Sequence, residues 1–319
     1  MRRVAFLVFA VLVAGCSVIS VDFSPRVRPL REETVEGSGA AKILLIDVSG
    51  FLSDEGSPSL TIGTPPPRVP LLVRFREELK KAAEDAQVKA LVLRINTPGG
   101  TVTASDIMYR ELEMFRREHP IPIVAALMDV AASGGYYVAL AADQIVAHPT
   151  SVTGSIGVIM LTMNAEGLMQ KIGVSATAIK SGERKDMGSP FRMLTPEERA
   201  IFQGVIDDLH RQFVAKVAER RRISIETAGT LADGRIYTAS QALAQKLVDR
   251  VGYMPDAIDT ARRAAGLREA RVIVYHRPRE YRATYYAKAE SDTATLPASL
   301  AQLTSLGGPG PRFLYLWLP

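Results

Sequence analysis

Two consecutive copies of one local pattern, a hydrophobic strand followed by a glycine turn and a helix, constrain the fold of this chain most strongly. The first copy places the apolar run Ala90–Ile95 before the turn Asn96–Gly100 and a helical segment from Ala104 to Arg117. The second copy runs from Ile123 to Ala142, with its glycine turn at Ala131–Gly135. Consecutive units of this kind connect parallel strands by right-handed crossovers, so both turns emerge at one edge of a sheet. We therefore predict an α/β fold with a parallel sheet and peripheral helices.

Composition excludes several classes of protein. With 319 residues and 47% hydrophobic side chains, the chain can bury a large core, which rules out disorder as its general state. The net charge of +5 is modest, and it predicts no nucleic-acid partner. A single cysteine cannot form an intramolecular disulfide, and the spacings CxxC and HExxH are missing from the sequence. No metal and no cofactor are predicted.

The N-terminus has the pattern of an export signal. Arg2 and Arg3 precede eleven apolar residues from Val4 to Ala14, fewer than the roughly 20 that a membrane-spanning helix needs. This run ends in Leu-Val-Ala-Gly before Cys16 and resembles a bacterial lipobox, in which the cysteine is lipidated and becomes the mature N-terminus. The alternative is an uncleaved signal anchor with an incidental thiol. Both predict a body tethered to a membrane of the bacterial cell envelope, on the extracytoplasmic (periplasmic) side.

Changes of composition along the chain predict its division. Residues 1–15 are the signal peptide, and residues 16–41, with scattered proline and glycine, are a tether. Residues 42–266 are the folded domain, in which Val174–Ile179 is a strand candidate. The helix after Thr195 carries an apolar stripe from Ile201 to Val217 that is expected to be buried. Residues 267–319 form a basic and apolar extension, either partly disordered or lying on anionic lipid.

Ser133 is the candidate nucleophile. It stands where a strand turns sharply into a helix, and the glycines that follow it permit close approach of a substrate backbone. The amides of Gly134 and of Gly99, the first free amide after Pro98, are the candidate donors to an oxyanion. Taken singly, each of these segments is also explained as a plain turn.

Lys185 is the candidate general base. The four histidines lack a local pattern that would orient an imidazole, whereas Lys185 follows the apolar run Val174–Ile179. A lysine accepts a proton only when it is neutral, so it must be shielded from water, with Ser155, Ser181 and Ser189 as hydrogen-bond partners. Lys180 is a rival, and a solvated loop lysine is the alternative interpretation.

Four segments in order resemble the signal peptide peptidase A family of serine peptidases, a branch of the Clp protease and crotonase superfamily with repeated ββα units. These segments are Arg94–Gly100, Asp129–Tyr137, Thr153–Val158 and Ser181–Asp186 with Ser189-Pro190. The resemblance implies a Ser-Lys dyad in which Ser133 attacks, Lys185 is the general base and Ser155 orients the lysine.

The resemblance also implies a partner and a substrate. Ser133 and Lys185 are 52 positions apart, as in the short, single-copy form of the family. In such members neighbouring protomers of a homo-oligomer contribute the serine and the lysine of one site. The implied activity is a membrane-tethered serine endopeptidase acting on cleaved signal peptides or other extended apolar peptides. A crotonase-like acyl-coenzyme A enzyme and a noncatalytic lipoprotein scaffold remain as alternatives, and the export signal disfavours the first.

Overall fold

The computed structural model describes residues 29–54, 69–277, 284–286 and 312–318. Its elements, in chain order, are β1 (Arg31–Gly37), β2 (Lys42–Ser49), α2 (Leu71–Ala83), β3 (Val88–Thr97), β4 (Gly99–Thr101), α3 (Val102–Glu118), β5 (Ile123–Ala132), α4 (Gly134–Ala139), β6 (Gln144–Ala147), β7 (Val152–Gly154), β8 (Ile159–Met160), α5 (Glu166–Lys171), α6 (Pro196–Arg221), α7 (Ile225–Leu231), β9 (Ile236–Thr238), α8 (Ala239–Ala244), β10 (Arg250–Val251), α9 (Met254–Ala264), β11 (Arg271–His276) and β12 (Phe313–Leu316).

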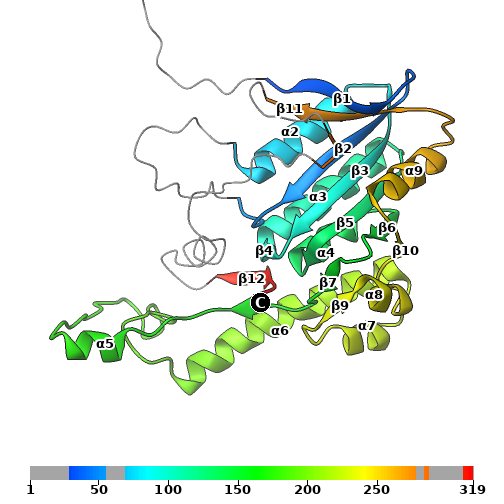
Figure 1. The fold of residues 1–319 in the computed structure, drawn as a ribbon. Helices are drawn as coiled ribbons and strands as arrows, with labels where there is room; N and C mark the ends of the chain where they lie inside the picture. Colours follow the sequence, from blue (N-terminus) through cyan, green and yellow to red (C-terminus); the bar gives the residue numbers. More distant parts are fainter. Residues whose placement is uncertain (1–28, 55–68, 278–283, 287–311, 319) are drawn as a thin grey trace, which may run out of the picture.

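A mostly parallel sheet, nine-stranded within the described residues, forms the centre of the molecule (Figure 1). Its order is β1-β11-β2-β3-β5-β6-β10. β7 pairs with the last residues of β5, and β9 pairs with β7. Only β1 and β9 run antiparallel to their neighbours. The predicted class, α/β with a parallel sheet and peripheral helices, is confirmed.

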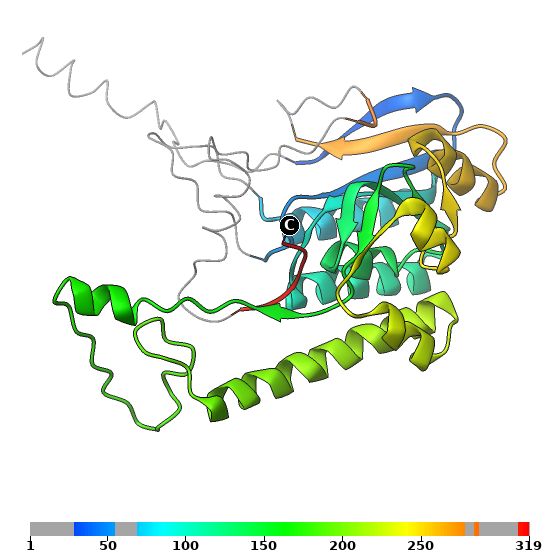
Figure 2. The same ribbon diagram turned by 60° about the horizontal axis from the view of Figure 1, so that its bottom comes forward.

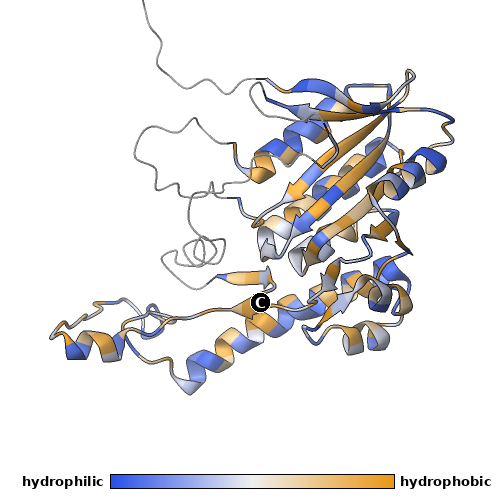
Figure 3. Ribbon diagram, in the orientation of Figure 1, coloured by the Kyte–Doolittle hydropathy of each residue, from blue (hydrophilic) through white to orange (hydrophobic). Residues whose placement is uncertain are grey.

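Both faces of the sheet are buried, because alternate residues of each strand point to opposite sides. Leu44 and Ile46 of β2 pack into the larger core with α2 and α3, whereas Ile43 and Leu45 face α9. Figure 3 shows the resulting hydrophobic stretches along β2, β3 and β5. Full burial of such a side chain stabilises the folded state by about 1.5–3 kcal/mol. The strands are therefore firmly packed, and the glycine turns extend from their ends.

Two segments that the sequence placed outside the domain belong to the main sheet. β1 lies inside the range predicted as tether and pairs with β11. β11 lies inside the predicted C-terminal extension, yet it pairs with β2 and buries Val272 to Tyr275. The predicted boundaries at residues 42 and 266 are therefore wrong. A short apolar run between Arg271 and His276 is sufficient for a strand when both of its edges find partners.

The segment from Leu161 to Val205, here called the arm, projects away from the sheet and includes α5 and the first turns of α6 (Figures 1 and 2). The predicted strand Val174–Ile179 is wrong, because these residues are exposed and have no strand partner. The apolar stripe of α6 is buried only in its second half. Phe213 and Val217 are fully buried against the body, whereas Ile201 and Val205 are 37% and 39% exposed on the arm, where no second layer covers them.

The predicted signal peptide and Cys16 lie outside the described residues. Among the helices that the structure describes, none combines the length and hydrophobicity needed to cross a bilayer.

Candidate active site

Ser133 sits at a strained bend between β5 and α4. Its φ of +50° and ψ of −113° are values that a residue with a side chain rarely adopts, at a cost of about 1–3 kcal/mol. Its N–H donates to the carbonyl of Gly154 at 2.7 Å, which fastens the bend to the end of β7. The hydroxyl is fully buried and has no hydrogen-bond partner among the described residues. A buried hydroxyl in this state is available to an incoming group.

The two glycine turns meet at this bend, as the repeated strand-turn-helix pattern predicts. A Cβ added to Gly99 would lie 2.9 Å from the backbone nitrogen of Gly134. A Cβ on Gly134 would lie 2.4 Å from Oγ of Ser105, and one on Gly135 would lie 2.6 Å from Cγ2 of Thr97. Only residues without a side chain allow the two turns to approach so closely.

The predicted oxyanion donor Gly99 is engaged elsewhere in this structure. Its N–H donates to Oγ1 of Thr97 at 3.0 Å, and its carbonyl accepts from Leu52 at 2.9 Å. Thr101 donates to the carbonyl of Leu52 at 2.8 Å, so the alternation of the backbone turns the N–H of Gly100 to the opposite side of β4. That is the side on which β12 pairs, and the nitrogen of Gly100 also lies 3.3 Å from the position of a Cβ added to Gly134. Gly100 is therefore a second candidate donor, which turn composition alone does not distinguish from Gly99.

Ser155 lies beside Ser133. Ala132 and Gly154 are paired residues at the ends of the neighbouring parallel strands β5 and β7. Each strand is followed directly by a serine with positive φ, +50° at Ser133 and +48° at Ser155. The N–H of Ser155 donates to the carbonyl of Arg235 at 2.7 Å, and the residue is buried. The two predicted serines are therefore brought together at the same edge of the sheet.

Lys185 is not brought to this place within one copy of the chain. It lies in the loop of the arm between α5 and α6, and it is exposed. The Ser133 hydroxyl has no partner in the part of the chain that the structure describes, so neither Lys185 nor any of the four histidines bonds to it.

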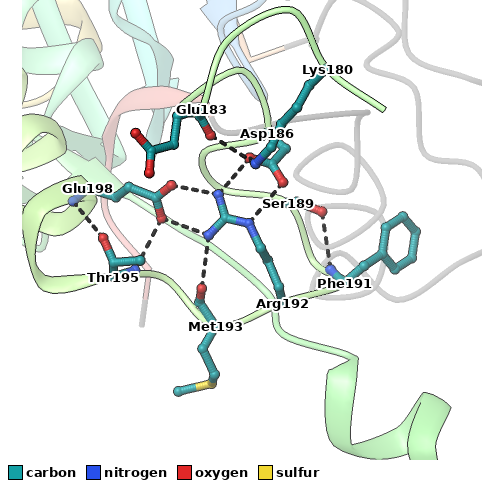
Figure 4. Close-up of polar contacts among 9 residues, drawn as sticks. All are labelled: Lys180, Glu183, Asp186, Ser189, Phe191, Arg192, Met193, Thr195 and Glu198. Carbon is teal, nitrogen blue, oxygen red and sulfur yellow. Dashed lines mark hydrogen bonds and ion pairs between the residues drawn. The ribbon is translucent and has the colours of Figure 1, made fainter. Parts of the chain in front are cut away.

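The rival Lys180 has a structural role in the arm (Figure 4). Its amine bonds Asp186 at 2.6 Å, and Asp186 also binds the guanidinium of Arg192. Arg192 in turn holds Glu198 at the first turn of α6, at 2.5 Å, and thereby joins the loop to the helix. Hydrogen bonds from Arg192 and then Lys180 hold the pKa of Asp186 well below its usual range, and Arg192 lowers the pKa of Glu198 to about 2. Lys180 is therefore engaged in an ion pair within the arm, and its amine bonds to Asp186.

An unexpected strand, β12, lies against the glycine turns. It pairs with β4 on one side and with β8 on the other, both antiparallel. Tyr315 of β12 is 1% exposed and stacks on Tyr137 of α4, with ring centroids 5.2 Å apart. The sequence placed these residues in the C-terminal extension, because the segments that pair with them are only two and three residues long.

The described residues contain no cluster of histidine, cysteine, aspartate or glutamate that could hold a metal ion. The bend itself presents the hydroxyl of Ser133 and the backbone of the glycine turns.

Known proteins resemble this chain in sequence. The model of peptidase family S49 matches residues 116–268. A protein of Enterococcus faecium, provisionally named signal peptide peptidase SppA, is 37% identical over 247 residues, which cover 77% of this chain and 70% of that protein. The chloroplastic serine protease SPPA of Arabidopsis thaliana is 34% identical over 230 residues, 72% of this chain and 33% of that protein. A solved structure, a mutant of the membrane-bound stomatin-specific protease 1510-N, has a TM-score of 0.44 at 14% identity and covers 70% of this chain and 85% of that chain.

Proposed function

Because the chain belongs to peptidase family S49, whose members are serine-type peptidases, we propose that it is a membrane-tethered endopeptidase with Ser133 as nucleophile and Lys185 as general base. The observation that carries this proposal is the Ser133 hydroxyl, buried and without a partner at a strained bend between two glycine turns. Strain and an unsatisfied buried hydroxyl are costs that a merely structural turn does not need.

In the proposed reaction, Oγ of Ser133 attacks the carbonyl carbon of the scissile peptide bond while its proton passes to the neutral amine of Lys185. Backbone N–H groups at Gly134 and Gly100 stabilise the oxyanion of the tetrahedral intermediate. The lysine then gives its proton to the leaving amine, and an acyl-serine remains. Water, deprotonated by the same lysine, releases the new carboxylate and restores the serine. Ser155, next to Ser133, positions the amine.

The lysine is proposed to come from a neighbouring copy of the chain. Within one copy Lys185 is exposed on the arm and makes no hydrogen bond to Ser133. The arm also exposes a set of large apolar side chains, as expected of a surface that a second copy covers. They are Leu161, Met163, Leu168, Ile172, Val174, Ile179, Phe191 and Met193. Docking of this arm onto a neighbour would remove Lys185 from water and lower its pKa.

The proposed substrates are cleaved signal peptides or other extended apolar peptides. The Enterococcus relative carries signal peptide peptidase in its name. The short strands β4 and β8 hold β12 between them in antiparallel pairing, which shows that their edges can bind a chain in extended form. Lipidation of Cys16 would hold the enzyme at the membrane of the cell envelope, where such peptides are released.

Mixing two inactive variants tests both the Ser-Lys dyad and the proposal that neighbouring copies of the chain contribute its two residues. Ser133→Ala and Lys185→Ala are each expected to lose hydrolysis of an apolar fluorogenic peptide, whereas Lys180→Ala, the matched control, keeps it. If neighbours share each site, co-assembled Ser133→Ala and Lys185→Ala chains recover about a quarter of the wild-type activity by random pairing. Recovery of nothing would overturn the sharing, and full activity of either single variant would overturn the dyad. A scaffold without activity would also fail to react at Ser133 with a fluorophosphonate.

A further inference from the structure

Asn96 lies where the regular pairing between β3 and β5 is interrupted. On β5, residues 128–130 all lie opposite Asn96 alone. The regular pairs on either side of this interruption are Ile95 with Leu127 and Thr97 with Ala131. A strand that carries extra residues loses ladder hydrogen bonds at that place and bends, and such irregularities are common next to active sites.

β5 also changes its neighbour on the other side at this place. It pairs with β6 over residues 124–127 and with β7 over residues 130–132. The end of β5 that leads to Ser133 is therefore set off from the rest of the strand. A bond across the interruption is what can fix this end relative to β3.

The side chain of Asn96 supplies such a bond. Its Oδ1 accepts a hydrogen bond of 3.2 Å from the backbone N–H of Val130. On the side of β2, the main-chain carbonyl of Asn96 accepts from the N–H of Gly50, also at 3.2 Å. Asn96 therefore links the ends of β2, β3 and β5. The link is close to the site, because Asn96 stands three positions before Gly99 and Val130 stands three positions before Ser133.

The next residue, Thr97, extends this link to the glycine turns. Its hydroxyl donates to the carbonyl of Gly50 and accepts from the N–H of Gly99 at 3.0 Å. Its Cγ2 lies 2.6 Å from the position of a Cβ added to Gly135, in the second turn. A shift of β3 against β5 at this level would therefore change the spacing of the two turns.

We infer that Asn96 is a positioning residue of the proposed reaction, whose side-chain oxygen sets the distance between the Ser133 hydroxyl and the backbone donors of the first glycine turn. The inference rests on the proposed function and adds a residue to it. The hydroxyl has no hydrogen-bond partner in the described part of the chain, so Asn96 acts through Val130 and not on the nucleophile itself. The spacing of nucleophile and oxyanion donors matters most in the transition state, so its loss affects kcat more than KM.

Two substitutions of nearly equal size separate the hydrogen bond from the shape of the side chain. Asn96→Leu removes the acceptor, and kcat for an apolar fluorogenic peptide should fall by about tenfold to a hundredfold, with KM within about twofold of the wild-type value. Asn96→Asp keeps an oxygen at the same place, so its kcat should stay within about threefold of wild type. An unchanged kcat in Asn96→Leu, or an equal loss in both variants, would overturn the inference.

Asp143→Leu is the matched control. Oδ2 of Asp143 accepts from the backbone N–H of Ile123 at 2.9 Å, so this variant loses a bond of the same kind at the opposite end of β5. Because this end is remote from the glycine turns, kcat should stay within about twofold of wild type. A loss as large as that in Asn96→Leu would show that kcat follows the general stability of β5, and the inference would fall.

Hydrogen exchange gives a reading that does not depend on catalysis. In full chains that also carry Ser133→Ala, residues 128–135 should exchange at least about tenfold faster with Asn96→Leu than with Asn96→Asp, because the N–H of Val130 loses its acceptor. Equal exchange would overturn the inference whether or not the wild type cleaves peptides. Faster exchange in a protein whose wild type cleaves nothing would support the link through Asn96 and overturn the peptidase proposal. If Asn96→Leu does not fold, Asn96→Ser replaces it in both measurements, because its hydroxyl is too short to reach the N–H.

Discussion

The backbone N–H of Ser133 donates a hydrogen bond of 2.7 Å to the carbonyl oxygen of Gly154. This contact ties the end of β5 to the end of β7 and places Ser155 immediately beyond it. Two serines with left-handed backbone conformations thereby face the same edge of the sheet, one fully buried and the other nearly so.

Ser155 is expected to act on the base and not on the nucleophile. Ser155→Ala should lower kcat by up to about a hundredfold, the lower end of the range that general acid–base catalysis contributes, because the variant keeps the base and loses only its positioning. Because the base functions only when its amine is neutral, wild-type activity should rise from acid toward alkaline pH, and the rise should move when Ser155 is lost. The pH dependence of kcat checks this. Loss of activity with an unmoved profile would assign Ser155 a role in the fold alone.

Gly134 should not tolerate a side chain. In Gly134→Ala the new methyl group would lie 2.4 Å from Oγ of Ser105, and overpacking of this kind costs about 1–3 kcal/mol. The free energy of unfolding, measured in urea, should fall by that amount. Removal of the hydroxyl in the double variant Ser105→Ala, Gly134→Ala should recover part of the loss. Equal stability of the single and double variants would show that this contact is not the cause.

The buried ion pair between Arg94 and Asp47 supports the first glycine turn from the strands below it. Both side chains are less than 10% exposed, and Oγ of Ser49 also bonds the carboxylate at 2.8 Å. Arg94→Ala leaves a charge buried without this partner, so we expect a loss of about 3–5 kcal/mol in the free energy of unfolding.

The exposed pair of Arg76 with Glu111 is the matched control for the buried pair. Arg76 is 74% exposed, and Arg76→Ala should cost less than about 1 kcal/mol. Similar losses for Arg94→Ala and Arg76→Ala in urea unfolding would contradict the assignment of a supporting role to the buried pair.

The arm should loosen in acid. Asp186 and Glu198 have lowered pKa values in the folded chain, about 2 for Glu198, because Arg192 stabilises their charged forms. Their contribution is present above the ordinary carboxyl range near pH 4 to 5 and is lost as the pH falls toward 2. Hydrogen exchange of residues 180–198 should therefore accelerate between pH 5 and pH 3, relative to that of the central strands, after correction for the intrinsic rate. Glu198→Gln should show fast exchange already at pH 7.

The parts that the sequence predicts well are those governed by local pattern. The runs at Ile123 and Gln144 give strands, Thr195 begins α6 with a capping box, and the glycine turns meet because parallel strands end at one edge. The position of Ser133 follows from the same rule, whereas Ser155 is predicted only as a hydrogen-bond partner of the lysine.

The remaining parts depend on contacts that are distant in sequence. β12 is a strand because Gly99–Thr101 and Ile159–Met160 flank it, and its pairing with segments so distant in the chain is not visible in its own sequence. The engagement of Gly99 with Thr97 depends on one rotamer. Ile201 and Val205 lie on the apolar face of α6 at helical spacing, yet they are exposed. The spacing of apolar residues predicts which face of a helix is apolar, but it does not predict whether another element packs on that face.

The exposed position of Lys185 would make the proposed activity depend on association between copies of the chain. A single copy of the chain would hold this amine in water, away from the serine that it is proposed to activate. Cleavage would begin only when the loop of one polypeptide docks onto the next. The proposed enzyme would therefore stay inactive until its local concentration at the membrane is high enough for association.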